Sequence, residues 1–525
     1  MAPVHPLLAA PEIVRLISEN LNSSSLSAFA RSRRALMEIA SQQLYKTLDS
    51  QQLEKLAVRL LSYVPAPEPG ANARVDRFRQ MYAQHVLHIS IGTFSSHTKQ
   101  KEVSTWRHLQ RLMMIWPTET LFPNLRSLKC TADEPEQVET ILKLLVMPLE
   151  ELFVTGSSLP IVLEQDWNVP VTFLLAALPE RCPHLRKLGL NIQATSLDHV
   201  GSFERAFSLL TNLTLLECDY IAYHPSVFSR IADLPNLKRL RIGWSAEFLW
   251  PEFGSPLSDG EPHFTCMKSL SLEGSSTVLQ EAFASIRCDL VELDVGITLT
   301  KSAEHHALTS LAADIHSYYP NLRTLQCRVM DASEQDEEGP HHPALLGSFL
   351  RCRHITCFGF CYSTTHSDQD QLLHFGNEDI GAIALAWPNL TELRIDCPLA
   401  DPMALTIDCL GDLAKHCKAL TSIELPMLCA DDVAAPPCKG SYEQTISLTL
   451  KLSSYSNAST VALFLSALWP NIQFGHSCQY CVQIKTLHEM LGYCKIMERY
   501  EIGQIPKSAI AHLSPRYRVP FLITP

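Results

Sequence analysis

The hydrophobic positions of this chain repeat in a short unit, in which leucine or another apolar residue stands at the first, fourth and sixth positions. The clearest units each begin two residues after a proline, at Leu125, Leu185, Leu237, Leu322 and Leu390. Weaker units begin at Val86, Leu149, Leu213, Met267, Leu290, Ile355, Leu420 and Ile472. Because the fourth and sixth positions alternate with polar residues, each unit predicts one short strand with one buried side.

The segments between these units have apolar residues at helical spacing. Examples are residues 138–145, 173–178, 308–315 and 461–468. A single strand and helix cannot bury their apolar sides, whereas a stack of about a dozen such pairs can. The predicted fold class is therefore α/β: a leucine-rich-repeat solenoid with parallel strands on the concave face and helices on the convex face. A doubly wound α/β domain is the alternative, and it would show fewer units and a glycine-rich phosphate-binding turn, which the sequence lacks.

Proline, glycine and charged residues mark interruptions of the repeat pattern. A proline-rich stretch at residues 64–71 and insertions at residues 245–264 and 331–343 are predicted loops. The predicted domains are a helical domain at 1–60, a connecting segment at 61–85, the solenoid at 86–475, and a C-terminal helix and tail at 476–525.

The N-terminal segment has a different, helical pattern. Apolar residues at positions 13, 14, 17 and 21 form one helical face, and Pro11 and Glu12 suit a first helical turn. A second helix is predicted from about Leu26 to Ala40, followed by an apolar segment at residues 44–48. Two helices are too small to hold a core alone. Their apolar faces must therefore pack on the repeats, on another chain, or on both.

These N-terminal residues resemble an F-box. Leu36 stands in the place of the family's usual tryptophan, and Ser18 stands where a bulky residue is typical. Together with the repeats, the segment resembles the fungal-type F-box proteins with leucine-rich repeats. The resemblance implies binding to a Skp-family adaptor, and through it to a cullin-RING ubiquitin ligase, while the repeats bind an unknown substrate protein. The adaptor-facing residues that it implies are Leu8, Pro11, Glu12, Ile13, Val14, Ile17, Leu21, Leu26 and Phe29.

Two other roles stay open at this point. The helical pair could serve only as a lid on the end of the solenoid, because exposed terminal repeats need one. The repeats could also form a protein-interaction scaffold outside any ubiquitin pathway.

Substrate recognition would use the third, fifth and seventh positions of each unit, which project toward the concave face. The charged residues at these positions change sign along the chain, which predicts a polar surface divided by charge. The predicted substrate-binding residues are Lys187, Arg239, Arg241, Glu273, Glu292 and Asp294.

Composition narrows the class of partner. The formal net charge of -12, without a Lys/Arg-rich block, argues against nucleic acid. The sequence has no run of 18 apolar residues and no secretory signal. We therefore expect no membrane association and a cytoplasmic or nuclear location. In such a reducing compartment most of the 17 cysteines are expected to be buried free thiols.

Candidate chemistry is sparse. The sequence has no Gly-x-Ser-x-Gly elbow, phosphate-binding glycine loop or His-Glu-x-x-His helix. His476, Cys478, Cys481, His488 and Cys494 have the ligand types for zinc, but a single Cys-x-x-Cys lacks a second pair, and the last two residues fall in a predicted helix at 484–497. We therefore predict no enzyme activity, no cofactor and no metal site.

Overall fold

The structure, a computed structural model, describes most of the chain between residues 11 and 474. The described ranges are 11–32, 34–62, 83–92, 99–115, 121–156, 168–192, 199–243, 263–299, 304–331, 343–364, 375–397, 404–430, 445–455, 458–469 and 471–474. Leu8, the proline-rich stretch, most of both predicted insertions, the zinc candidates and the predicted C-terminal helix lie outside these ranges.

Each predicted unit from Val86 to Leu420 coincides with a strand, whereas the unit predicted at Ile472 begins one residue earlier, at Asn471. Leu185, for example, lies two residues before its strand, so that the fourth and sixth positions of the unit fall inside it. The strands follow one another in chain order and pair in parallel, as predicted for the solenoid. They are β1 (Thr47–Leu48), β2 (His88–Ile91), β3 (Ser127–Ala132), β4 (Glu151–Gly156), β5 (Lys187–Asn191), β6 (Leu215–Cys218), β7 (Arg239–Ile242), β8 (Ser269–Gly274), β9 (Glu292–Leu299), β10 (Thr324–Asp331), β11 (Cys357–Thr364), β12 (Glu392–Asp396), β13 (Ser422–Ala430), β14 (Thr445–Tyr455) and β15 (Asn471–Phe474).

Helices form in all four segments where helical spacing predicts them, namely α8, α9, α13 and α17. The described α-helices are α1 (Pro11–Glu19), α2 (Ser23–Ser32), α3 (Arg34–Leu44), α4 (Ser50–Leu61), α6 (Lys99–Ile115), α8 (Pro135–Leu144), α9 (Asn168–Arg181), α10 (Val200–Leu209), α11 (Pro225–Ala232), α12 (Ser276–Ser285), α13 (Glu304–Tyr318), α14 (Pro343–Phe349), α15 (Asn377–Ala386), α16 (Cys409–His416) and α17 (Ala458–Leu468). Two short 3-10 helices, η2 (Ala83–His85) and η4 (Tyr220–Tyr223), complete the described helical elements.

One helix prediction is wrong. Where the sequence predicts a single helix from about Leu26 to Ala40, the structure has two helices, α2 and α3. At the end of α2 the hydroxyl of Ser32 donates to the carbonyl of Phe29 at 2.7 Å, and side-chain bonds of this kind compete with the helical backbone. The two helices pack on each other, which one continuous helix could not do.

Two strands have no counterpart among the predicted units. β1 pairs with β2, so the sheet begins at Thr47, inside the residues 1–60 assigned to the helical domain. β14 pairs with β13 in a register that places Thr445 at the first position of its unit. Threonine occupies this position in place of leucine, so the leucine pattern does not identify the strand. Ile446 and Leu448 of the strand are nevertheless buried.

The core of the repeats is formed by the repeated apolar positions. In the unit of β5, Leu185 and Leu188 are fully buried and Leu190 is 3% exposed. The other side of each strand carries the third, fifth and seventh positions, which are more polar. The leucine pattern therefore decides which face of each strand turns inward.

The asparagine in the Pro-Asn dipeptides connects successive repeats. The side chain of Asn124 donates to the carbonyl of Gln84 at 2.7 Å, and that of Asn236 donates to the carbonyl of Thr211 at 3.0 Å. These bonds satisfy carbonyl groups in the turns of the preceding repeat.

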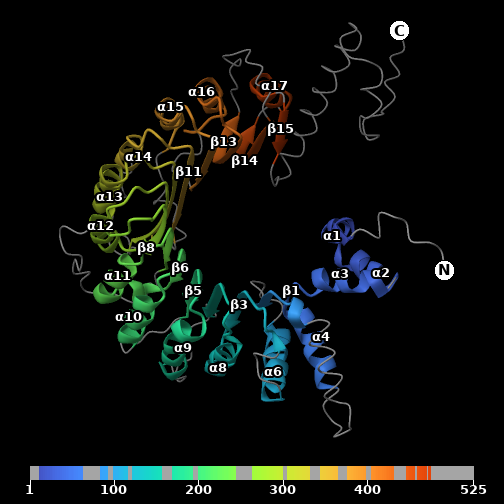
Figure 1. Ribbon diagram of the computed structural model, residues 1–525. Helices are drawn as coiled ribbons and strands as arrows, with labels where there is room; N and C mark the ends of the chain where they lie inside the picture. Colours follow the sequence, from blue (N-terminus) through green and yellow to red (C-terminus); the bar gives the residue numbers. More distant parts are fainter. Residues whose placement is uncertain are drawn as a thin grey trace, which may run out of the picture. The chain divides into compact units, whose positions relative to one another are not determined.

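The chain divides into two compact units, Met1–Leu272 with Ala284–Cys288, and Glu273–Phe283 with Asp289–Pro525. In the first unit, helices α4, α6 and α8 to α11 lie along one side of the strands (Figure 1). In the second unit, helices α13 to α17 do the same (Figure 1). In each unit the third, fifth and seventh positions lie on the side of the strands away from these helices, here called the open face.

Candidate protein-interaction surfaces

The N-terminal helices α1, α2 and α3 form a small group with its own interior. Val14, Leu26 and Leu36 are only 1%, 5% and 6% exposed. Ser18, one turn after Val14, is also buried, and its hydroxyl donates to the carbonyl of Val14 at 2.8 Å. Both residues that depart from the F-box pattern, Ser18 and Leu36, therefore fit this interior without leaving a buried polar group unsatisfied.

Helix α1 also has an apolar face that is open to solvent. Leu16 is 58% exposed, Ile17 is 36% exposed and Ile13 is half-buried. Their i, i+3, i+4 spacing places the three side chains on one face of the helix. Arg15 and Glu19 form an exposed ion pair of 3.3 Å on another face. An apolar helix face of this kind is typical of a surface that another protein covers.

The predicted adaptor-facing residues fall into two groups. Val14 and Leu26 lie in the interior of the helical group and hold it together. Pro11 begins α1, and Leu8 lies outside the described residues. The remaining predicted residues are exposed or half-buried: Glu12, Ile13, Ile17, Leu21 and Phe29.

Leu16 is the most exposed apolar residue of α1, and the sequence prediction does not include it. The signal that identifies it is its spacing of three residues from Ile13 and one from Ile17. The face predicted from sequence includes Val14 instead, because apolar residues at positions 13, 14, 17 and 21 also match a helical period.

The open face of the first unit carries the three predicted basic residues, Lys187, Arg239 and Arg241. The ammonium group of Lys187 on β5 lies 2.6 Å from Oε1 of Glu151 on β4, and Ser127 on β3 donates to Oε2 at 3.1 Å. Burial by itself would raise the pKa of Glu151, but the hydrogen bonds from Lys187 and Ser127, and the nearby positive charge, lower it. Glu151 is therefore ionised and holds Lys187 in place.

Arg239 and Arg241 lie two residues apart on β7, and both are exposed. The strand register places Ser269 beside Arg239 and Ser271 beside Arg241 on β8. On the other side, Leu215 of β6 lies beside Arg239. Two guanidinium groups thus border a pair of hydroxyl groups and one half-buried apolar side chain.

Lys129 and Phe153 add a cation and an aromatic ring to the same face. The ammonium group of Lys129 lies 5.2 Å from the centroid of the Phe153 ring, within the range of a cation–π contact. The ring lies over Gly189 of β5, where a Cβ atom would collide with it. Glycine at this position therefore allows Phe153 to lie flat across the neighbouring strand.

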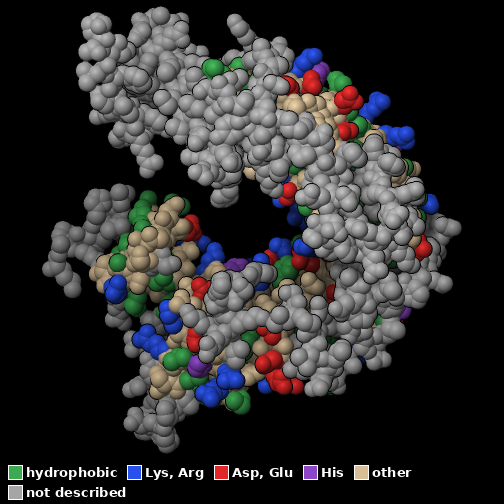
Figure 2. Space-filling model, turned by 180° about the vertical axis from the view of Figure 1, so that it is seen from behind, with side chains coloured by type: hydrophobic (Ala, Val, Ile, Leu, Met, Phe, Trp, Pro, Cys, Tyr) green, Lys and Arg blue, Asp and Glu red, His purple; other side chains and the backbone are tan. Residues whose placement is uncertain are grey.

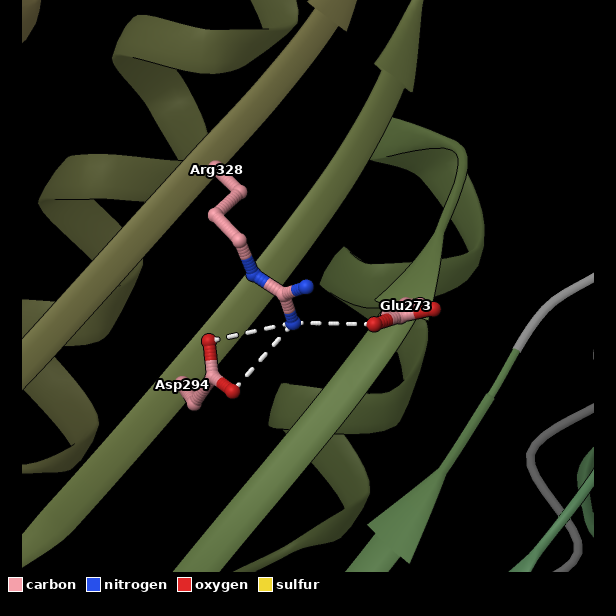
Figure 3. Close-up of polar contacts among 3 residues, drawn as sticks. All are labelled: Glu273, Asp294 and Arg328. Carbon is pink, nitrogen blue, oxygen red and sulfur yellow. Dashed lines mark hydrogen bonds and ion pairs between the residues drawn. The ribbon is translucent and has the colours of Figure 1, made fainter. Parts of the chain in front are cut away.

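In the second unit, Arg328 of β10 joins the predicted acidic residues Glu273 and Asp294 (Figure 3). Its Nη2 atom lies 2.8 Å from Oε1 of Glu273 and 3.2 Å from Oδ2 of Asp294. Partial burial by itself lowers the pKa of Arg328, but the two carboxylates outweigh that effect and raise the pKa. Glu273 and Asp294 are therefore not isolated negative charges, because one cation is shared between them.

Gly296 of β9 makes room for the ion pair between Arg328 and Glu273. Glu273 and Arg328 lie on β8 and β10, with β9 between them, and the register places Gly296 beside Arg328. A Cβ atom at Gly296 would lie 2.7 Å from Cγ of Glu273. Adjacent strands are about 4.8 Å apart, so the two long side chains must meet directly above the glycine.

Arg328 is absent from the predicted site residues although it follows the same rule. It occupies the seventh position of the unit that begins at Leu322, as Glu273 does in the unit that begins at Met267. Glu292, the other predicted acidic residue, lies at the third position of the unit that begins at Leu290 and is half-buried.

The described residues contain no group of three or more His, Cys, Asp or Glu side chains that could hold a metal ion. The zinc candidates from His476 to Cys494 lie outside these residues. Cys130, Cys182 and Cys218 are free and buried, as expected for small apolar side chains. None of the described helices has both the length and the apolar character needed to cross a bilayer.

Comparisons with known proteins add little to this description. No protein-family model matches the chain, and no curated protein matches it. Solved structures that resemble it include the complex of Rad7 and Elc1 from yeast, with a TM-score of 0.34 and 13% identity over 80% of this chain and 88% of that one. Another is the leucine-rich-repeat protein LegL7 from Legionella pneumophila, with a TM-score of 0.30 and 15% identity over 57% of this chain and 93% of that one.

A third is the complex of TLR13 with a single-stranded RNA, with a TM-score of 0.30 and 14% identity over 75% of this chain and 43% of that one. Similarity at this level is too low to transfer a partner or an activity. The repeat fold itself follows from the parallel strands in chain order, most of which bury leucine or isoleucine side chains.

Proposed function

We propose that this chain is the substrate-receptor subunit of a cullin-RING ubiquitin ligase. In this role α1 to α3 bind a Skp-family adaptor, and the open face of the repeats binds the substrate protein. The chain itself supplies no catalytic group, because the ubiquitin-transferring chemistry belongs to the other subunits of such a ligase.

The observation that carries this proposal is the apolar face of α1. Leu16 and Ile17 are exposed although the helical group has an interior of its own in Val14 and Leu26. Full burial of a large aliphatic side chain contributes about 1.5–3 kcal/mol. Leu16 is 58% exposed and Ile17 is 36% exposed, so an adaptor that covered both would gain about 1.5–3 kcal/mol from the two residues together.

The packing of the helices favours adaptor binding over a purely structural lid. A lid would turn its apolar face toward the repeats and a polar face outward. Here α1 packs on α3, and α3 contacts η2 at the first repeat. The apolar face with Leu16 therefore stays open, which supports a second protein as its partner.

The repeats support the second half of the proposal through their open face. Charged side chains such as Arg239 and Arg241 are exposed there. Among the residues that the structure describes, no helix covers the polar face of this parallel sheet, whereas helices cover both faces in an ordinary α/β domain. A repeat solenoid uses this face to bind extended surfaces of other proteins.

The test is capture of the full-length chain by the Skp-family adaptor of the same organism. We expect the unsubstituted chain to bind, and Leu16→Asp or Ile17→Asp to weaken binding by about tenfold or more, because a charge replaces a buried apolar contact. Leu209→Asp on α10 is the matched control, because Leu209 is 56% exposed and Leu16 is 58% exposed. This control variant should bind like the unsubstituted chain.

Two results would contradict the proposal. One is that the folded, unsubstituted chain fails to bind the adaptor. The other is that Leu209→Asp weakens binding as much as Leu16→Asp. Either result would leave a protein-interaction scaffold outside the ubiquitin pathway as the better description.

A further inference from the structure

The open face of the first unit has an excess of positive charge. At the third, fifth and seventh positions of β2 to β7, the basic residues are Lys129, Lys187, Arg239 and Arg241, here called the cationic strip. Glu151 and Glu217 are the acidic residues that oppose them, and Asp219 is buried with its pKa raised by burial to about 8. Four cations thus face two carboxylates, in a chain whose formal net charge is -12.

Basic side chains are visible along this part of the molecule. Figure 2 shows blue Lys and Arg side chains along the inner side of the strands of the first unit. The opposite sign of the strip and of the whole chain means that the strip is a local feature and not a result of overall composition.

We propose that the cationic strip binds an extended acidic segment of the substrate protein, with carboxylates at alternate positions of that segment. This inference rests on the proposed function, because it names the chemistry of the partner that the repeats would hold.

The spacing of Arg239 and Arg241 supports an extended ligand. Residues two apart on a strand point to the same side and lie about 6.6 Å apart along it. An extended peptide places every second side chain on one side at the same interval, so a Glu-x-Glu sequence presents two carboxylates to the two guanidinium groups. Each guanidinium can bind a carboxylate through two parallel hydrogen bonds.

The neighbours of the arginines favour a peptide over an isolated anion. Leu215 lies between Lys187 and Arg239 in the strand register and is half-buried. An apolar side chain of the bound segment can pack on it between the charged contacts. Ser269 and Ser271 on the other side add hydroxyl groups that can donate to a carboxylate.

One carboxylate of the chain limits the positive charge of the strip. Glu217 lies directly beside Arg241 in the register of β6 and β7. This carboxylate reduces the positive potential at Arg241 for every anion, so Arg239 is expected to contribute more to binding than Arg241. A nucleic acid would also have to overcome the negative charge of the whole chain.

The experiment measures binding of a fluorescent peptide of alternating glutamate and serine to the purified full-length chain by anisotropy. We expect the double variant Arg239→Glu/Arg241→Glu to weaken binding by about tenfold or more. The matched control is Arg111→Glu/Arg205→Glu, which makes the same charge change at exposed residues of α6 and α10 on the helical side. Its affinity should stay within about twofold of the original, because these sites are distant from the strip.

Several results would contradict the inference. The inference is wrong if a peptide of alternating lysine and serine binds as well as the glutamate peptide, or if the control variant loses as much affinity. It is also wrong if only a phosphoserine peptide or a single-stranded DNA binds. Arg239→Gln/Arg241→Gln, checked by thermal melting, provides a milder variant in case the charge reversal prevents folding.

The peptide assay does not involve the adaptor. Ile17→Asp should therefore weaken adaptor capture by about tenfold or more and leave peptide binding unchanged. If the unsubstituted chain binds the adaptor but not the glutamate peptide, only the proposed binding of an acidic segment is refuted. Intact peptide binding without adaptor capture would refute the ubiquitin-ligase role alone.

Discussion

The ion pair between Arg328 and Glu273 should depend on the glycine beneath it. The perturbation is a double-mutant cycle in which Arg328→Gln and Glu273→Gln are made singly and together. The same cycle is then repeated in a Gly296→Ala background. Glutamine has the shape of glutamate without its charge, and in place of Arg328 it removes the guanidinium group, so the cycle isolates the coupling between the two charges.

The structure sets the expected magnitude of this coupling. Nη2 of Arg328 and Oε1 of Glu273 are 2.8 Å apart, and the two side chains are 46% and 28% exposed. Exposed ion pairs contribute about 0.2–1 kcal/mol, and solvent screening applies to both groups here. The good hydrogen-bond distance places this pair at the upper end, about 1 kcal/mol, which is about a fivefold change in an equilibrium constant.

Gly296→Ala should remove most of this coupling. The new methyl group would lie 2.7 Å from Cγ of Glu273. Glu273 must then turn away from Arg328. The guanidinium group of Arg328 would keep only its contact with Asp294. We expect the coupling to fall below about 0.3 kcal/mol, within the range of independent sites.

The assay is hydrogen exchange of the amides of β9 and β10, followed by mass spectrometry. Local opening free energies suit a repeat protein better than one global transition, because long repeat arrays do not always unfold in a single step. High salt should reduce the coupling, because the pair is partly exposed. The reasoning is refuted if the coupling stays near 1 kcal/mol in the Gly296→Ala background, or if it is already negligible when Gly296 is present.

Two further predictions concern stability. Burial raises the pKa of Asp219 to about 8, above its ordinary value of about 4. Between about pH 4 and about pH 8 the folded chain therefore keeps a proton that the unfolded chain loses, and the free energy of unfolding should fall as the pH rises through this range. Asp219→Asn should make the melting temperature depend less on pH over this range. An unchanged pH dependence in the variant would contradict the prediction. Asp49 caps α4 by accepting from the amide of Gln52 at 2.8 Å, while its own amide donates to the Gln52 side chain at 3.1 Å. Asp49→Ala should lower the local free energy of unfolding by about 1 kcal/mol by hydrogen exchange, whereas Asp49→Ser should cost less because serine also caps helices.

The repeat architecture of this chain could be predicted from sequence because it depends on short-range spacing. An apolar residue two residues before most strands and apolar residues at the fourth and sixth positions are enough to decide which face is buried. The rule fails where the composition departs from it, as at Thr445 of β14 and Asn471 of β15. The same periodicity places Arg239 and Arg241 on the polar face without any knowledge of the fold.

The helical group could be predicted only in part. Hydrophobic spacing at positions 13, 14 and 17 fits two neighbouring faces of a helix, and it does not say which one a partner helix covers. The packing of α1 on α3 decides that Val14 is buried and that Leu16 is exposed. The break between α2 and α3 depends in the same way on contacts between helices.

The ion-pair cluster of the second unit needed the tertiary structure. Arg328 and Glu273 are 55 residues apart in the chain, and Arg328 and Asp294 are 34 apart. The periodicity of the sequence places all three residues on the same face of the strands. It does not say which of them become neighbours, because the lengths of the segments between the strands differ from repeat to repeat. Only the strand register brings their charges together, because it alone decides which residues of different repeats become neighbours above Gly296.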